Sequence, residues 1–175
     1  MLKEESFHLG TGANGIRRIV TQGVIPCALI QKYVNKWVST GLDLFGVDES
    51  TSAEWAYVYG IKGRYDERDN EVVADREHLN EESRSLYFDE LNKEMEAINA
   101  RRKDGEPELF IPSDKFNRSV GKFKGDRHDL RGNPFEGGDE DWEQYINDSL
   151  PGDEDESQLL EFFKEEWIQY REWKE

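Results

Sequence analysis

The chain has 175 residues and a formal net charge of −16, with 35% hydrophobic and 35% charged residues. So acidic a chain repels nucleic acid and anionic membrane surfaces, which excludes both as general partners. Its 21 aromatic residues argue against disorder throughout, and its length is enough for one domain with a hydrophobic core or for part of a larger one.

The single cysteine and the apolar runs limit the cellular context. Cys27 has no second cysteine to pair with, and its place before an apolar run predicts a buried thiol. No apolar run approaches the roughly 18 residues of a membrane-spanning helix. The first residues, Met1-Leu2-Lys3-Glu4-Glu5, lack the apolar core of a signal peptide. We therefore expect a cytoplasmic protein with no membrane partner.

Residues 1–22 are predicted to form a helix, because apolar residues continue one face of the segment. Glu5 and His8 lie three residues apart, so on a helix they share a face about one turn apart. A carboxylate oxygen and an imidazole nitrogen placed in this way can bind one metal ion. Asp75 and His78 repeat the spacing. Because the chain has 39 acidic residues, the spacing alone does not separate a metal site from coincidence.

Residues 10–15 spell Gly-Thr-Gly-Ala-Asn-Gly, the G-x-G-x-x-G pattern of dinucleotide-binding folds. That pattern binds a nucleotide only after a buried strand, and Lys3-Glu4-Glu5-Ser6 is too polar to be one. We favour a helix here, with small residues where another backbone comes close and with room for a kink. A strand before Gly10 would favour nucleotide binding instead.

Helical spacing of apolar residues predicts most of the remaining elements. The predicted helices are 27–45, a short helix after the capping box Thr51-Ser52-Ala53-Glu54, 72–103, a short helix around 142–146, and 156–173. Residues 108–112 are predicted to be extended. The fold class is therefore mainly α, with a helical part at 1–104 and, at 105–175, an irregular segment plus C-terminal helices. Residues 137–175 carry 14 acidic and 3 basic residues, which favours a solvated acidic tail over an interaction tail for a basic partner.

One basic cluster stands out in this acidic chain. Its members are Lys115, Arg118, Lys122, Lys124, Arg127 and Arg131. They could hold the phosphates of a nucleotide-like ligand, or they could neutralise neighbouring acids. His128, in the same Gly- and Asp-rich stretch, is expected to be exposed. A second metal site from Asp75, His78 and Glu82 competes with a solvated polar helix face, which the density of acids there favours.

Several segments resemble a known family when they are taken in order. They are Glu4-Glu5-Ser6-Phe7-His8, Gly15-Ile16-Arg17-Arg18-Ile19-Val20, Gln31-Lys32-Tyr33-Val34-Asn35, Ser39-Thr40-Gly41-Leu42-Asp43-Leu44-Phe45-Gly46 and Tyr59-Gly60-Ile61-Lys62-Gly63-Arg64-Tyr65. Together they resemble the C-terminal half of the oxygenase component of benzoyl-CoA 2,3-epoxidase. The likeness continues more weakly through Phe116-Asn117-Arg118-Ser119-Val120-Gly121 and Trp142.

The resemblance implies the C-terminal part of a ferritin-like helical bundle with an irregular, acidic C-terminal extension. It also implies a di-iron centre, a separate reductase, and epoxidation of the aromatic ring of benzoyl-CoA or a related aryl-CoA. Glu5 and His8 match the second of two Glu-x-x-His iron-binding pairs. Lys115, Arg118 and Lys122 become candidate contacts for the CoA phosphates.

In the family, the other iron ligands lie upstream of this second pair. We therefore expect a fragment or subunit that is inactive without a missing N-terminal half or a complementary subunit. A split gene, a truncated gene and a start assigned to an internal Met all fit this expectation. The alternative is a non-catalytic helical interaction protein or partner subunit, derived from the same fold, in which Glu5 and His8 bind no metal.

Overall fold

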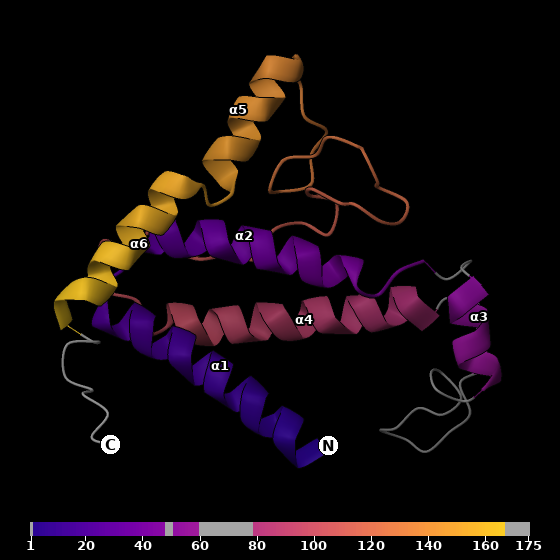
Figure 1. The fold of residues 1–175 in the computed structure, drawn as a ribbon, viewed down its shortest axis with the longest axis horizontal. Coiled ribbons are helices and arrows are strands. Elements are labelled where there is room, and N and C mark those ends of the chain that lie inside the picture. Colours follow the sequence, from indigo (N-terminus) through magenta and orange to yellow (C-terminus); the bar gives the residue numbers. More distant parts are fainter. Residues whose placement is uncertain (1, 48–50, 60–78, 167–175) are drawn as a thin grey trace, which may run out of the picture. The chain divides into compact units, whose positions relative to one another are not determined.

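A computed structural model describes residues 2–47, 51–59 and 79–166 (Figure 1). These ranges contain six α-helices and no β-strand, and an isolated β-bridge pairs His128 with Pro134. The helices are α1 (Leu2–Gln22), α2 (Cys27–Asp43), α3 (Thr51–Val58), α4 (Leu79–Asn99), α5 (Asp139–Ser149) and α6 (Asp153–Glu166). The predicted fold class, mainly α, is confirmed. No helix among the described residues is both long and apolar enough to cross a membrane.

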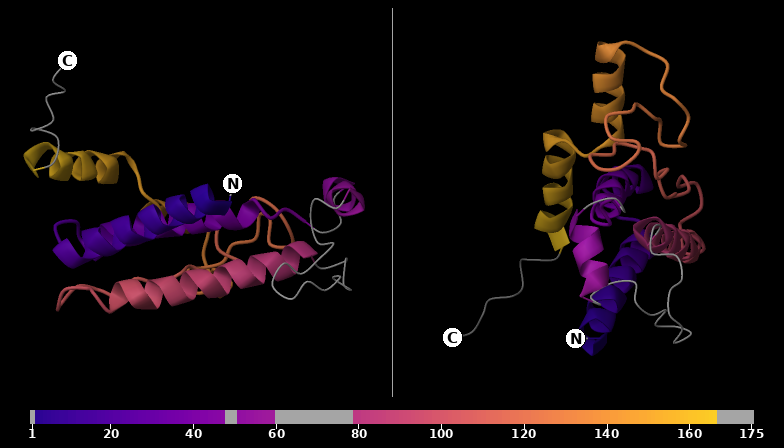
Figure 2. Two further views of the ribbon diagram at one scale, coloured as in Figure 1. Left: turned by 90° about the horizontal axis from the view of Figure 1, so that it is seen from below. Right: turned by 90° about the vertical axis from the view of Figure 1, so that its right-hand side faces the viewer.

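Helix α1 passes through the glycine-rich residues 10–15 without interruption, as the view from below shows (Figure 2). The helix ends where the backbone N–H of Gly23 donates to the carbonyl of Ile19 at 3.0 Å. Gly23 has φ +58°, the left-handed conformation that commonly closes a helix and that favours glycine. Because a helix and not a strand precedes Gly10, the nucleotide-binding interpretation of the glycine pattern is wrong.

The next helices begin close to the residues that local signals predicted. Pro26 precedes α2, and its carbonyl accepts the N–H groups of Leu29 and Ile30. Helix α3 begins at Thr51, the first residue of the predicted capping box. Helix α4 extends to Asn99, and the expected earlier start at 72–78 lies outside the described residues. The same holds for the predicted end of the last helix beyond Glu166.

The chain forms two compact units, each built from segments that are distant in sequence. The first consists of Met1–Lys36, Asn92–Ile111 and Glu136–Glu175; the second consists of Trp37–Leu91 and Pro112–Phe135. Each unit therefore takes part of α2 and part of α4. The predicted division between 1–104 and 105–175 stays a prediction.

In the first unit, paired amide side chains hold an extended segment. Gln31 donates to the carbonyl of Phe110 at 2.8 Å and accepts the N–H of Phe110 at 2.8 Å. Asn99 makes the same two-way contact with Leu109, at 2.7 and 3.0 Å. The backbone of the predicted extended run is thus satisfied by side chains and not by a neighbouring strand. The buried apolar side chains of this unit are Val20, Cys27, Leu29, Met95, Ile98, Leu109 and Ile111, the last two from the extended segment itself.

In the second unit, the residues that follow α2 contact α4 through an aromatic pair. The rings of Phe45 and Tyr87 lie 5.4 Å apart between centroids. A Cβ at Gly41 would come within 3.3 Å of the Tyr87 hydroxyl, so the Tyr87 side chain would have to shift slightly to admit one. Leu42 and Phe116 are fully buried in the same unit. Phe116 belongs to the stretch 112–135 that carries the basic cluster, so its burial anchors that stretch in this unit.

Candidate functional site

The predicted metal pair lies in the first turns of α1. Glu5 and His8 are both helical, so the backbone places them on one face as expected. The His8 side chain is exposed, and its ring meets Phe7 edge to face at 6.3 Å. The Glu5 side chain lies outside the described part of the structure. The role of this pair as metal ligands stays a prediction.

A complete metal site would need more ligands than this pair. Among the described residues, no group of three or more His, Cys, Asp or Glu side chains is placed to hold a metal ion. A di-iron centre takes carboxylates and imidazoles from several helices. The described residues therefore do not form such a centre by themselves. The second candidate site, Asp75 with His78 and Glu82, falls mostly on residues outside the described ranges.

The basic cluster lies on a long loop, 112–135, without regular secondary structure. The loop is closed by its own backbone, because Ser113 donates to Leu130 at 2.9 Å and Phe135 donates to Arg127 at 2.9 Å. Asp129 accepts hydrogen bonds from within the loop, including two from Asn133. Burial alone would raise the pKa of the Asp129 carboxyl, but these hydrogen bonds outweigh it and hold the pKa below its usual value.

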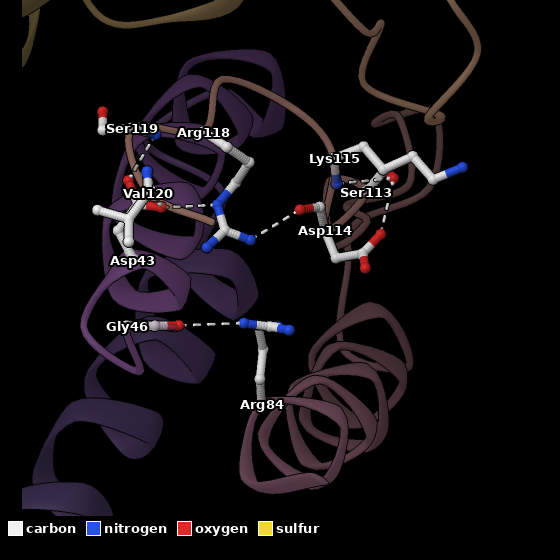
Figure 3. Close-up of polar contacts among 9 residues, drawn as sticks. All are labelled: Asp43, Gly46, Arg84, Ser113, Asp114, Lys115, Arg118, Ser119 and Val120. Atoms are coloured by element: carbon white, nitrogen blue, oxygen red, sulfur yellow. Dashed lines mark hydrogen bonds and ion pairs between the residues drawn. The ribbon is translucent and has the colours of Figure 1, made fainter. Parts of the chain in front are cut away.

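Asp43, the last residue of α2, anchors this loop (Figure 3). One of its carboxylate oxygens accepts the Nε of Arg118 at 2.7 Å and the N–H of Val120 at 3.3 Å. The other accepts the N–H of Ser119 at 3.0 Å. Arg118 also donates through Nη1 to the carbonyl of Asp114 at 2.8 Å, and its side chain is 4% exposed. The buried guanidinium thus links the end of α2 to the backbone of the loop.

The other two predicted phosphate contacts gather around an aromatic ring. The Nζ of Lys115 lies 5.4 Å from the centre of the Phe123 ring, and the Nζ of Lys122 lies 5.7 Å from it. Both distances are within cation–π range. His128 meets the same ring edge to face at 5.6 Å. His128 is half-buried, so the expectation that it would be exposed is wrong.

The sequence analysis did not identify Asp43 or Phe123 as parts of this cluster. Asp43 carried a usable signal, because a carboxylate in the last turn of a helix is disfavoured by the helix dipole. Such a residue needs a cation or N–H donors close by, and the structure supplies both. Phe123 carried no comparable signal, since an aromatic residue in a loop is compatible with any packing role.

The buried thiol was predicted correctly. Cys27 is 2% exposed at the start of α2, where its N–H donates to a carboxylate oxygen of Glu106 at 2.9 Å. Burial, reinforced by the negative charge of Glu106, raises the pKa of the thiol above its usual value. The thiol form is therefore favoured, which argues against a nucleophilic role.

Comparison with known proteins bears on the expected family. No protein-family model matches the chain. The chain is similar to benzoyl-CoA oxygenase component B of Aromatoleum evansii, with 29% identity over an alignment of 151 positions. This match covers 70% of the chain but 31% of the relative. Which part of the relative it represents stays a prediction. The resemblance found in the sequence is thus confirmed at the level of a distant relationship to an oxygenase component.

Proposed function

We propose that this chain contributes part of the di-iron site of an oxygenase that epoxidises the aromatic ring of benzoyl-CoA or a related aryl-CoA. The observation that carries the proposal is the distant relationship to benzoyl-CoA oxygenase component B. The placement of Glu5 and His8 one turn apart in α1 supports it, because this spacing supplies ligands in di-iron helical proteins.

The chemistry of the donors fits iron. A carboxylate and an imidazole are ligands that suit iron and leave coordination positions open. Bound irons would supply the redox chemistry of dioxygen activation, with electrons from a separate reductase. Glu5 and His8 would hold one share of the metal, and the remaining ligands would come from polypeptide beyond this sequence. We assign no catalytic residue to this chain.

The surface of α1 supports a helical partner. Residues 5, 8, 12 and 19 repeat at spacings of three, four and seven, so they form one seam along the helix. A Cβ built at Gly12 would meet no other atom within 4 Å, and Ile16, beside the seam, is 40% exposed. Glycines in a helix cost about 1 kcal/mol each relative to alanine. A closely packed partner helix that carries the other ligands would explain why α1 contains these glycines despite their cost.

The iron content of the purified proteins tests this proposal. We expect the chain alone to hold substoichiometric iron. Co-expression with the part of the Aromatoleum evansii component B that it does not match should yield an iron-containing complex. Glu5→Ala or His8→Ala should then lower the iron content of that complex, while Glu4→Ala, a neighbouring exposed carboxylate, should leave it unchanged. A tightly held pair of irons in the chain alone would contradict the proposal.

The same variants test the alternative, a non-catalytic interaction protein. In that case, Glu5→Ala and His8→Ala would change neither the iron content of the complex nor the association with the complementary polypeptide. Association without any dependence of iron on Glu5 and His8 would therefore favour the alternative.

A further inference from the structure

The 112–135 loop concentrates positive charge in an acidic protein. It carries six basic and three acidic residues, whereas the whole chain has a net charge of −16. Lys115 and Lys122 make no ion pair with any acidic group in the part of the chain that the structure describes. Two of the three acids of the loop make hydrogen bonds to other groups, since Asp114 accepts the Ser113 hydroxyl and Asp129 accepts backbone N–H groups. Within the described ranges, the two ammonium groups therefore have no carboxylate partner.

Both ammonium groups lie within cation–π distance of one ring, Phe123. Like charges held near each other repel, and the ring offsets only part of that repulsion. His128 lies against the same ring, and its Nδ1 is buried with no hydrogen-bond partner among the described residues. An arrangement with unused cations and an unused polar atom is suited to an anionic ligand.

Arg118 has a different part in the loop. Its guanidinium is buried and already donates to Asp43 and to the carbonyl of Asp114 (Figure 3). It holds the chain between Lys115 and Lys122, which lie three and four residues from it on either side. We call these contacts of Arg118 with Asp43 and Asp114 the Arg118 clamp. Asn117 (φ 47°) and Gly121 (φ 92°) adopt left-handed conformations beside it, so the loop is folded tightly around the clamp.

We propose that Lys115 and Lys122 bind a ligand with more than one phosphate group, and that Asp43 and Arg118 form a positioning pair that holds the two lysines around Phe123. The class of ligand rests on the proposed function, because the CoA part of an acyl-CoA carries several phosphates. The division of roles rests on the geometry alone. Arg118 is thus a positioning residue and not a phosphate contact.

Titration of the full chain with adenosine 3′,5′-bisphosphate at constant ionic strength tests the binding role. Lys115→Gln and Lys122→Gln should each raise the Kd by roughly three- to tenfold, as expected for the loss of a charge-assisted hydrogen bond. Lys124→Gln is the matched control, because Lys124 is an exposed lysine of the same loop. Its Kd should stay within about twofold of the unmodified chain. An unchanged Kd in the Lys115 and Lys122 variants, or an equal loss in all three, would overturn the site.

The positioning role makes a prediction of opposite sign to simple electrostatics. Asp43→Asn removes a negative charge, so electrostatics alone would tighten anion binding, whereas a lost clamp should weaken it by about tenfold. Arg118→Lys keeps the charge but cannot reach Asp43 and the Asp114 carbonyl together. It should weaken binding as well, with displaced amide resonances for Ser119 and Val120 in NMR spectra. Unchanged or tighter binding in folded Arg118→Lys protein would refute the positioning role, even if Asp43→Asn fails to fold.

The outcomes separate this inference from the proposed function. Iron content depends on Glu5 and His8, and probe binding depends on the loop. Loss of iron in the α1 variants together with unchanged probe binding in the lysine variants would refute the loop site alone. The reverse result would refute the metal role and leave a phosphate-binding loop.

Discussion

At the scale of single residues, Asp155 shows how one carboxylate serves two elements. It accepts the N–H of Gly152 at 3.0 Å, which caps the start of α6, and it accepts the Nζ of Lys32 at 2.8 Å. The hydrogen bond from Gly152, followed by that from Lys32, holds the pKa of Asp155 below its usual value. The folded state therefore favours the charged carboxylate.

This lowered pKa predicts a dependence of stability on pH. The contribution of Asp155 is present above its unfolded-state pKa of about 3.9 and is lost as the pH falls through the lower folded-state pKa. Asp155→Asn should cost about 1 kcal/mol at pH 7, and the cost should vanish at strongly acidic pH. Urea unfolding at a series of pH values measures it. Asp153→Asn, an exposed carboxylate in the same turn, should show a smaller cost, and equal costs for the two would contradict the capping role.

Gln31 is a second residue whose side chain stands in for backbone pairing. Gln31→Leu should lower the free energy of unfolding by about 1–3 kcal/mol, because the N–H and carbonyl of Phe110 lose their partners. Denaturant unfolding followed by circular dichroism measures the change. Gln144→Leu, which removes an exposed contact to Asp148 one helical turn away, should change stability by less than about 0.5 kcal/mol. Similar losses in both variants would indicate a general effect of the substitution.

At the scale of elements, α1 is a helix that its own sequence weakens. Gly12→Ala should stabilise the isolated chain by about 0.5–1 kcal/mol, since the added Cβ meets no atom within 4 Å. Gly23→Ala should do the opposite, because Gly23 has φ +58° and a Cβ there would come within 2.5 Å of the Lys103 side chain. Helix content and urea unfolding of the two variants measure this. Destabilisation by Gly12→Ala would show that the position is closely packed already in the isolated chain.

At the scale of the whole molecule, the large negative net charge predicts that salt changes the thermal stability. With a net charge of −16, like-charge repulsion should destabilise the folded chain most at low ionic strength. Raising NaCl from about 20 to about 200 mM should therefore raise the Tm by a few degrees. An equal rise of the Tm when KCl replaces NaCl would identify charge screening as the cause. A fall in Tm would show that ion pairs such as Lys32–Asp155 outweigh the repulsion.

The sequence by itself determined most of the helices and the placement of Glu5 and His8 on one helical face. Apolar periodicity, Pro26, the capping box at Thr51 and the glycines that end helices act within a few residues, so they can be recognised without a fold. The same holds for the spacing of Glu5 and His8 and for the burial of Cys27. The resemblance to an oxygenase component was also readable from segments taken in order.

Only the tertiary structure decided how the irregular segments are held. Asp43 and Arg118 lie 75 residues apart, and Gln31 and Phe110 lie 79 apart. Such pairs leave no local pattern, because a side chain that satisfies a distant backbone obeys no periodicity. The same reason applies to the basic loop, where the sequence gathered the lysines but only the fold placed Lys115 and Lys122 on one ring and turned Arg118 inward to Asp43.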